Sequence, residues 1–597
     1  MIKQDVFHLI LVALFSINAI AQTTLDEVVV SSPRLDIPFS ENSKSVTVIT
    51  AEQIAATPVT SFADLLRFQA GLDIRRQGVE GAQADVYLRG GTFDQVLLLI
   101  DGIRVDDPQT GHHTLNSALP LEVIERVEIV KGPSARIYGQ NAFTGAINIV
   151  TKRAAENKTT LYERRGSYNT NQLGITHQLA NDNSQHIAHA SYNSSDGYRY
   201  NTDFRNLHFF THSSFGTTQK YKLITMFNER KFGANGFYGV TSAEDQYEET
   251  QSSLVALTTS VTSKNTSFTP RIFWKRGQDE YIYVRNNPGV YRNVHINNKI
   301  GVSLDTKIAH TNGNRTGFGA ELSTVAIQSN NLGQHSRTIA HLFFEHRISL
   351  NRLSLTPGFA LSHFSDVATF FYPGLDIGYA LNNASKLTFN TGYTYRVPTY
   401  NDLYYNGPQA IGNANLKPEK ALSYELAYRH ASSNWSIEAA LFQRNSENLI
   451  DYVEVTPGDP KWLASNAQEV STFGGEFISS FAFDIGKYQQ QLTLSYAYVK
   501  DDYTKTVVSR YALNALKHNV NIQLLKKFTS RWSSSTSYRY AARALGGNYQ
   551  VVNAQLAYTA GDWGIQLQGR NLFNADYVEN LIPMPKAHGV ISLQHSF

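Results

Sequence analysis

Residues 124–152 read IERVEIVKGPSARIYGQNAFTGAINIVTK, and the interpretation of the whole chain starts from this segment. Two runs rich in strand-forming residues, 127–130 and 146–150, lie toward its ends. The part between them is dense in turn residues: Gly132, Pro133, Gly139, Asn141 and Gly145. Glycine adopts backbone angles that other residues resist, and proline fixes φ and removes a hydrogen-bond donor. The segment therefore predicts a strand, a tight irregular loop and a second strand.

The composition limits the classes of protein to consider. A chain of 597 residues exceeds one compact core, so we expect at least two structural units. It is unusually aromatic, with 33 Tyr and 32 Phe, yet beyond the N-terminus it has no apolar run that could form a membrane helix. A membrane-spanning form would have to be a closed barrel. The net charge of +3 does not point to nucleic acid, and the lack of cysteine excludes disulfides and cysteine nucleophiles.

The first residues have the pattern of an export signal. Lys3 precedes the apolar run 6–20, and Ala19 and Ala21 form a small-residue cleavage site. We predict a signal peptide at 1–21, with an uncleaved anchor as the alternative. The following residues, 22–32, contain an extended run with three consecutive valines: Leu25, Asp26, Glu27, Val28, Val29, Val30 and Ser31. Taken alone, this run is typical of an ordinary edge strand.

The rest of the chain divides into two patterns. Residues 33–153 mix short strands, such as 46–50 and 96–100, with short helices at 51–54 and 61–68, the second capped by Ser61. Residues 154–597 alternate apolar and polar side chains, so that Lys386, Arg396 and Arg429 all fall on the polar face. Alternation over about 440 residues with so much tyrosine is typical of a transmembrane barrel of about 20–24 strands rather than of a soluble sandwich.

The segment at 124–152 closely resembles the hallmark of the plug domain in TonB-dependent outer-membrane receptors. The shared residues are Glu125, Glu128, Lys131-Gly132-Pro133, Tyr138-Gly139 and Gly145-Ala146-Ile147-Asn148-Ile149, with Thr144-Gly145 in place of the usual paired glycines. Two further stretches agree. Residues 396–419 resemble the family's mid-barrel signature, and residues 571–577 with the terminal Phe597 resemble its C-terminal signature.

The resemblance implies a fold, a location and a mode of action. The fold is all-β dominated, with a 22-stranded transmembrane β-barrel (154–597) closed by an N-terminal α/β plug domain (33–153). The location is the bacterial outer membrane. Residues 25–31 look like the TonB box, which adds as a strand to a TonB-type periplasmic energy transducer. Import is then driven by the proton gradient without covalent chemistry, and the sequence contains no G-x-S-x-G, HExxH or Walker motif. We expect no catalytic residues and no required cofactor.

In this family the substrate is contacted by plug apices and outer loops. The corresponding candidates here are Arg76, Gln77, Glu80, Asp106, Asp107, Gln109, His112, His113, Phe237 and Tyr238. Each of these loops could equally be plain polar surface. His112 and His113 would point in opposite directions on a strand, so we do not expect them to share a metal.

The cargo is less firmly indicated than the class. Length and local stretches such as 195–198 and 473–476 look most like cobalamin receptors. A ferric-siderophore receptor is the alternative, and a haem receptor is disfavoured because no histidine lies between Arg396 and Leu416. Some cobalamin receptors order outer loops with calcium, for which the candidate ligands are Asp196, Asp203, Glu244 and Asp245. Solvated loop acids are the alternative. Outer-membrane lipid is an expected partner, and a surface lipoprotein could be another.

The resemblance also implies a latch between plug and barrel. Arg89 occupies the family's strand-Arg-Gly position, where an arginine usually pairs with barrel glutamates. We predict that Arg89 and Arg136 pair with Glu425 and Glu476. Charge-assisted pairs of this kind hold position and remain breakable under a pulling force.

Overall fold

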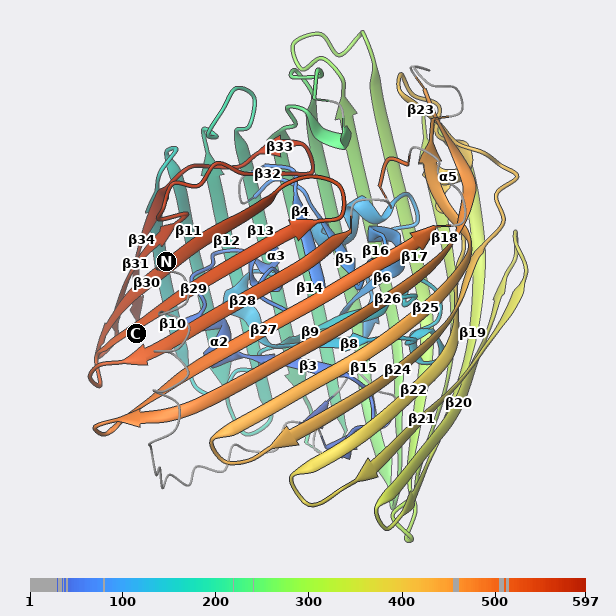
Figure 1. The fold of residues 1–597 in the computed structure, drawn as a ribbon, viewed down its shortest axis with the longest axis vertical. Coiled ribbons are helices and arrows are strands. Elements are labelled where there is room, and N and C mark those ends of the chain that lie inside the picture. Colours follow the sequence, from blue (N-terminus) through green and yellow to red (C-terminus); the bar gives the residue numbers. More distant parts are fainter. Residues whose placement is uncertain are drawn as a thin grey trace, which may run out of the picture.

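The computed structural model describes residues 29–30, 35, 37–38, 41–78, 81–217, 219–239, 241–454, 461–503, 509–511 and 515–597. In this part of the chain, 22 antiparallel strands form a closed barrel around a smaller N-terminal domain, the plug (Figure 1). The fold class predicted from the sequence is therefore confirmed. None of the described helices is long and apolar enough to cross a membrane.

The barrel strands follow one another around the wall in chain order. They are β10 (Lys158–Gly166), β11 (Thr170–Ala180), β12 (Ser184–Ser195), β13 (Phe204–Phe215), β14 (Lys220–Gly233), β15 (Tyr247–Ser263), β16 (Thr266–Ile282), β17 (Arg292–Ala309), β18 (Arg315–Ser329), β19 (Gly333–Leu350), β20 (Leu353–Phe364), β21 (Thr369–Ala380), β22 (Ser385–Arg396), β24 (Glu419–Ala431), β25 (Trp435–Val453), β26 (Trp462–Ile485), β27 (Tyr488–Tyr503), β28 (Leu516–Lys527), β29 (Trp532–Arg543), β30 (Asn548–Ala560), β31 (Trp563–Arg570) and β34 (His588–Ser596). The last strand, β34, pairs with β10 and closes the barrel.

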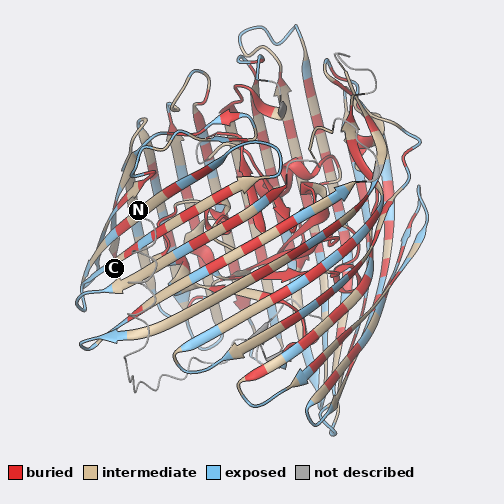
Figure 2. Cartoon of the chain, viewed as in Figure 1, coloured by how far each residue is buried: buried red, intermediate tan, exposed pale blue. Residues whose placement is uncertain are grey.

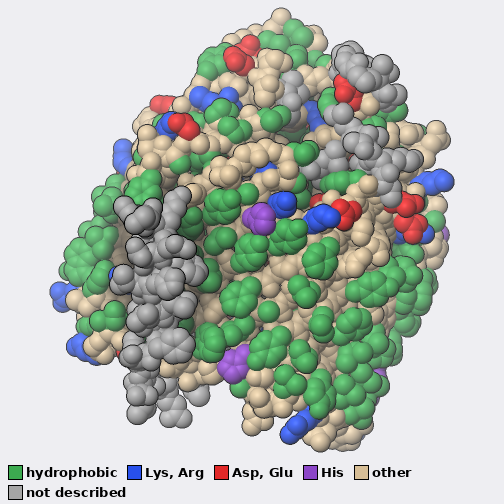
Figure 3. Space-filling view, viewed as in Figure 1, with side chains coloured by type: hydrophobic (Ala, Val, Ile, Leu, Met, Phe, Trp, Pro, Cys, Tyr) green, Lys and Arg blue, Asp and Glu red, His purple; other side chains and the backbone are tan. Residues whose placement is uncertain are grey.

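Side chains alternate between the two faces of the barrel wall. On β22, Asn390, Thr394 and Arg396 are buried on the inner side, whereas Leu387 and Tyr393 are exposed on the outer side. The same banding runs along most strands in Figure 2. Hydrophobic side chains spread over the outer face of the strands in Figure 3. An apolar outside and a polar inside suit a wall that contacts lipid.

The plug contains two small sheets. The larger one has the order β3 (Val46–Thr50), β8 (Ile124–Lys131), β9 (Gly145–Thr151), β6 (Val96–Ile100), β7 (Ile103–Arg104). The smaller one pairs β4 (Leu72–Arg76) with β5 (Ala84–Leu88). The plug helices are α2 (Ala51–Ala56), α3 (Phe62–Leu66), α4 (Ala135–Tyr138) and the 3₁₀ turns η2 (Phe93–Gln95), η3 (Gly111–Ser117) and η4 (Leu121–Val123).

A few short elements lie outside the wall and the plug sheets. They are β1 (Val29–Val30), β2 (Ile37–Pro38), η5 (Phe237–Gly239), α5 (Tyr400–Tyr404), β23 (Ala410–Ile411), β32 (Val578–Glu579) and β33 (Ile582–Pro583). Of these, β23 pairs in parallel with β26, so the segment between β22 and β24 is fixed against the neighbouring wall.

The segment 124–152 forms the centre of the larger plug sheet. Its two predicted strands are confirmed as β8 and β9, which pair antiparallel, and the loop between them contains the short helix α4. Gly145 has a φ of +157°, and a Cβ at this position would lie 2.3 Å from the carbonyl oxygen of Val130. Only glycine lets the loop return this closely to its partner strand.

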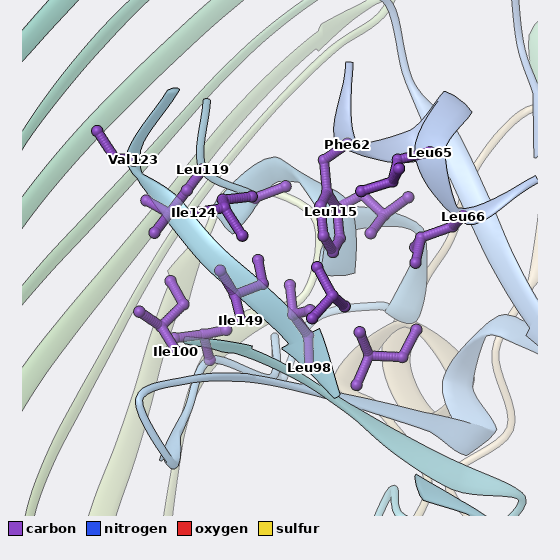
Figure 4. Packing of buried hydrophobic residues seen from close by; sticks show 14 of the residues in the cluster. Phe62, Leu65, Leu66, Leu98, Ile100, Leu115, Leu119, Val123, Ile124 and Ile149 are labelled. Atoms are coloured by element: carbon purple, nitrogen blue, oxygen red, sulfur yellow. The ribbon is translucent and has the colours of Figure 1, made fainter. Parts of the chain in front are cut away.

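Apolar side chains join the plug to one side of the barrel. Leu65, Leu98, Leu115 and Ile149 pack together in the plug core (Figure 4). The same cluster continues into inward-facing residues of five neighbouring wall strands: Ile187, Phe210, Ile224, Met226, Leu254, Ala256 and Phe273. The wall from β12 to β16 therefore holds the plug by apolar contact.

Leu98→Ala tests this core. Leu98 is 1% exposed, and its truncation should destabilise the plug by about 2–5 kcal/mol through lost burial and a residual cavity. Hydrogen-exchange mass spectrometry of plug peptides should show faster exchange. Leu441→Ala, on the outer face and 57% exposed, serves as the control and should leave plug exchange unchanged. Equal exchange in both variants would contradict the assignment of Leu98 to the core.

Candidate functional site

A cavity opens between the plug and the barrel at the end that carries α5 and β23 (top of Figure 1). It encloses about 1090 Å³ of empty space, part of which is open to solvent. Its plug side comes from η2 and from residues 109–113, and its barrel side comes from β15, β16, β17, β25 and the α5–β23 segment. We call it the apical cavity.

Aromatic rings form much of the cavity lining. The ring of Phe93 stacks on His112 with 3.8 Å between centroids, and Tyr511 meets Phe93 edge-on at 5.2 Å. Further tyrosines complete the lining: Tyr238, Tyr281, Tyr283, Tyr405 and Tyr452. Such rings offer large apolar faces and polar hydroxyl edges. The cavity can therefore contact the flat or apolar parts of a ligand as well as its polar groups.

An ionisable cluster also lines the cavity. The Nε2 atom of His113 lies 3.5 Å from Glu248 Oε1 and 3.9 Å from Asp279 Oδ2. Burial disfavours the imidazolium, but the carboxylates of Asp279 and Glu248 outweigh burial and raise the pKa of His113 to about 9. Glu248 and Asp279 lie on the polar face of their strands but were not among the predicted residues.

Four of the predicted substrate residues line the apical cavity: Gln109, His112, His113 and Tyr238. The two histidines belong to the 3₁₀ turn η3, so the strand that we assumed for them was wrong, while the expectation that they do not share a metal stays a prediction. The Nδ1 atom of His112 lies 2.9 Å from Asp85 Oδ1. Gln109 donates a 3.0 Å hydrogen bond to Asp279.

Asp106 and Asp107 bind barrel lysines instead of lining the cavity. Asp106 lies 2.8 Å from Nζ of Lys299, and Asp107 lies 3.3 Å from Nζ of Lys275. Burial opposes charge on both carboxyls, but the lysines outweigh it and hold both pKa values below their usual range. These aspartates anchor the plug loop to β16 and β17.

The remaining predicted contacts lie elsewhere. Arg76 pairs with Asp64 at 3.1 Å, away from the apical cavity. Gln77 and Phe237 are fully buried, and Phe237 packs against Phe232. These three side chains do not belong to the lining of the apical cavity. Glu80 lies outside the described residues.

Three of the four predicted calcium ligands have side-chain partners of their own, and calcium binding by the four stays a prediction. Asp203 is held by Arg285 at 2.6 Å, and Asp245 accepts a 2.6 Å hydrogen bond from Tyr200. Asp196 accepts a 3.1 Å hydrogen bond from Asn169, and Glu244 joins no cluster of ligands. Among the described residues, the only group of three or more metal-ligating side chains is His113, Glu248 and Asp279.

The predicted latch residue Arg89 contacts both barrel glutamates. Its Nε and Nη2 atoms lie 2.8 Å and 3.1 Å from the two oxygens of Glu476, and its Nη1 bonds Glu425. Lys131, which we did not predict, adds a 2.8 Å contact to Glu476. All four side chains are almost completely buried.

Arg136 contacts the barrel through different carboxylates from those predicted. Its Nη2 lies 3.1 Å from Glu345 and also bonds Asp376. The helix α4 places Arg136 against the wall strands β19 to β22, and Glu345 and Asp376 lie on two of these strands. The position of Arg136 in the sequence gives no information about which wall strands α4 approaches.

Residues of the mid-barrel signature connect the barrel wall to the plug. Arg396 lies 2.9 Å from Asp402 and 3.0 Å from Glu419, and Gln95 of the plug donates a 2.7 Å bond to Glu419. This network fixes the α5–β23 segment between the wall and the plug. Period-two alternation predicted that Arg396 faces inward, but not these partners.

The predicted TonB box falls mostly outside the described residues, as does the predicted signal peptide. Val29 and Val30 alone are described, and they form β1, which pairs with β2. The last plug strand ends at Thr151 and the first barrel strand begins at Lys158.

Two protein-family models match the chain. The model described as "TonB dependent receptor-like, beta-barrel" matches residues 133–572, and the "TonB-dependent Receptor Plug Domain" model matches residues 38–146. The chain therefore belongs to the family of TonB-dependent receptors, which lie in the outer membrane and mediate TonB-dependent transport.

Individual relatives and solved structures are similar to the chain over most of its length. The vitamin B12 transporter BtuB of Photobacterium profundum is 26% identical over 598 residues, covering 93% of each chain. The protein of the same name from Vibrio vulnificus strain CMCP6 is 22% identical, covering 74% of this chain and 73% of the relative. Among solved structures, the siderophore receptor PiuA from Acinetobacter baumannii has a TM-score of 0.78 at 14% identity, covering 96% of this chain and 99% of that one. At that identity the likeness shows the fold alone.

Glu425→Ala and Glu476→Ala test the latch. Each variant leaves Arg89 buried without its full set of partners. This should lower the free energy that holds the plug in the barrel by about 3–5 kcal/mol. Proteolysis of the plug in a urea series should then begin at lower urea concentration. Glu447→Ala removes a surface carboxylate that pairs with Lys420 and is 54% exposed, so this control should behave as wild type. Unchanged plug release in both latch variants would refute the latch.

Proposed function

We propose that this receptor imports cobalamin across the outer membrane, driven by a TonB-type energy transducer and the proton gradient. The observation that carries the proposal is the apical cavity, whose floor is the plug and whose walls are rich in tyrosine. Cobalamin combines a large planar ring with polar amide groups, and this lining offers both kinds of contact. The match to vitamin B12 transporters over most of the chain length supports the same cargo.

The geometry suggests how cargo and plug are coupled. The backbone N–H groups of Tyr400 and Asn401 donate 3.0 Å hydrogen bonds to the carbonyls of Pro108 and Gln109. A ligand in the cavity thus touches a plug loop that is itself bonded to α5. Force applied at residues 25–31 would have to break the buried plug–barrel ion pairs before this loop could leave.

A ferric siderophore is the second candidate cargo. Aromatic rings and polar side chains also suit a metal chelate built from catechols or hydroxamates. Siderophore receptors are among the solved structures of the same fold. A haem cargo is less well supported, since α5 and β23 supply no histidine between Arg396 and Leu416.

Calcium in the outer loops stays a proposal. An ion held by Asp196, Asp203, Glu244 and Asp245 would have to displace Arg285 from Asp203. Outer-membrane lipid against the apolar outer face and a surface lipoprotein over the outer loops are further proposed partners.

Calorimetric titration of the detergent-held protein tests the cargo. Cyanocobalamin should bind tightly and one-to-one, and Tyr281→Ala or Tyr405→Ala should weaken it about tenfold through loss of a ring. Tyr192→Ala, on the outer face, is the control. Haemin and a ferric siderophore are titrated in parallel, each with and without calcium chelation. Tight binding of the siderophore alone would refute cobalamin as the cargo and would leave the assignment to TonB-dependent receptors unchanged.

Val29→Pro tests the energy coupling. Proline removes a backbone donor from the strand that must pair with the transducer, so uptake should be lost while cobalamin binding persists. Val29→Ile keeps the extended backbone and should transport normally. If cells carrying Val29→Pro take up cobalamin at the wild-type rate, the assignment of residues 25–31 as the TonB box is wrong.

A further inference from the structure

The cluster on the floor of the apical cavity has the composition of a metal site. We propose that His113, Glu248 and Asp279 bind one divalent transition-metal ion of the Zn²⁺ class, at the boundary between plug and barrel. His113 comes from η3 of the plug, whereas Glu248 and Asp279 come from the neighbouring wall strands β15 and β16. The proposal does not depend on the identity of the cargo.

The spacing of the three side chains suits a single ion. One ligand atom from each residue lies within 4.8 Å of the other two. The two measured separations from His113 Nε2 are 3.5 Å to Glu248 and 3.9 Å to Asp279. A zinc ion with bonds of about 2.0–2.2 Å separates neighbouring ligands by about 3.3–3.6 Å. Small movements of the three side chains would bring their ligand atoms to bonding distance of one ion.

The charge at the cluster calls for a cation. Glu248 is 1% exposed and Asp279 is 5% exposed, and the described part of the chain places no lysine or arginine within ion-pair distance of either. Glu248 Oε1 and Asp279 Oδ1 are buried without a hydrogen-bond partner. His113 supplies at most one positive charge against these two carboxylates, and buried carboxylates that are not fully compensated are costly. A divalent ion with a neutral His113 would balance both negative charges.

Neighbouring groups orient the two carboxylates. The hydroxyl of Tyr238 bonds the second oxygen of Glu248, and the amide of Gln109 donates a 3.0 Å hydrogen bond to Asp279. Outer hydrogen bonds of this kind fix the direction of metal ligands and raise affinity. The cluster therefore resembles a prepared site more than a chance meeting of acids.

The ligand types select the class of metal. One imidazole nitrogen with two carboxylates suits Zn²⁺ and similar ions, whereas Ca²⁺ takes six to eight oxygens. Three protein ligands also leave coordination positions open toward the cavity, where water or a donor group of a bound molecule can enter.

The site would link two parts that must separate. Because one ligand belongs to the plug and two belong to the wall, a bound ion stabilises the plug inside the barrel. Movement of the plug would remove His113 and dismantle the site. Metal release would then accompany plug movement.

A metal titration of the full-length, tag-free protein in detergent tests the proposal. Zn²⁺ should bind one-to-one by calorimetry, Co²⁺ should produce visible absorption bands at the same stoichiometry, and Ca²⁺ should not compete. Glu248→Gln and Asp279→Asn keep the side-chain shapes and should weaken Zn²⁺ binding by more than about 100-fold. Loss of a residue that only orients a metal ligand already lowers metal affinity by up to about 100-fold. Glu249→Gln, one residue along β15, is the matched control and should bind as wild type.

A second measurement uses the wild type alone. Zn²⁺ should slow proteolysis of the plug in urea, and a chelator should reverse the effect. The proposal is overturned if wild type shows no saturable one-to-one binding, or if both variants keep wild-type affinity. In that case a protonated His113 bridging the two carboxylates accounts for the cluster. These titrations contain no cobalamin, so their outcome is separate from that of the cargo titration.

Discussion

Buried opposite charges hold the plug inside the barrel, and the arrangement of the molecule depends on them. Arg89 binds Glu425 and Glu476 on one side of the lumen, and Arg136 binds Glu345 and Asp376 on another. Removing one member of such a pair is costly, because its partner remains charged and dehydrated. The plug is therefore firmly seated against thermal motion. Apolar contacts along β12 to β16 complete the seat.

One plug loop connects this seat to the apical cavity. Its first residues, Asp106 and Asp107, bind lysines of β16 and β17. Its later residues, Gln109 and His113, line the cavity and reach the carboxylates of the same wall. Under the proposed function, recognition of the cargo and retention of the plug would involve neighbouring residues of a single loop, and a change in loop position would alter both.

Much of the fold could be predicted from local sequence. Alternation placed Asn390 and Arg396 inside and Leu387 outside, because the side-chain period of a strand is two whatever its neighbours are. The segment 124–152 predicted two strands and a tight loop, and the position of Gly145 follows from backbone sterics alone. For the candidate site, Gln109, His112, His113 and Tyr238 were found through the resemblance of their loops to plug apices and outer loops.

The sequence by itself determined the class of protein, the barrel with its plug, and the face on which most side chains lie. Only the tertiary structure decided which charges meet. It paired Arg136 with Glu345 and Asp376, and it brought His113 beside Glu248 and Asp279. The physical reason is that alternation specifies a face but neither a depth in the lumen nor an opposite strand. Those depend on the stagger of the whole barrel and on how the plug packs within it.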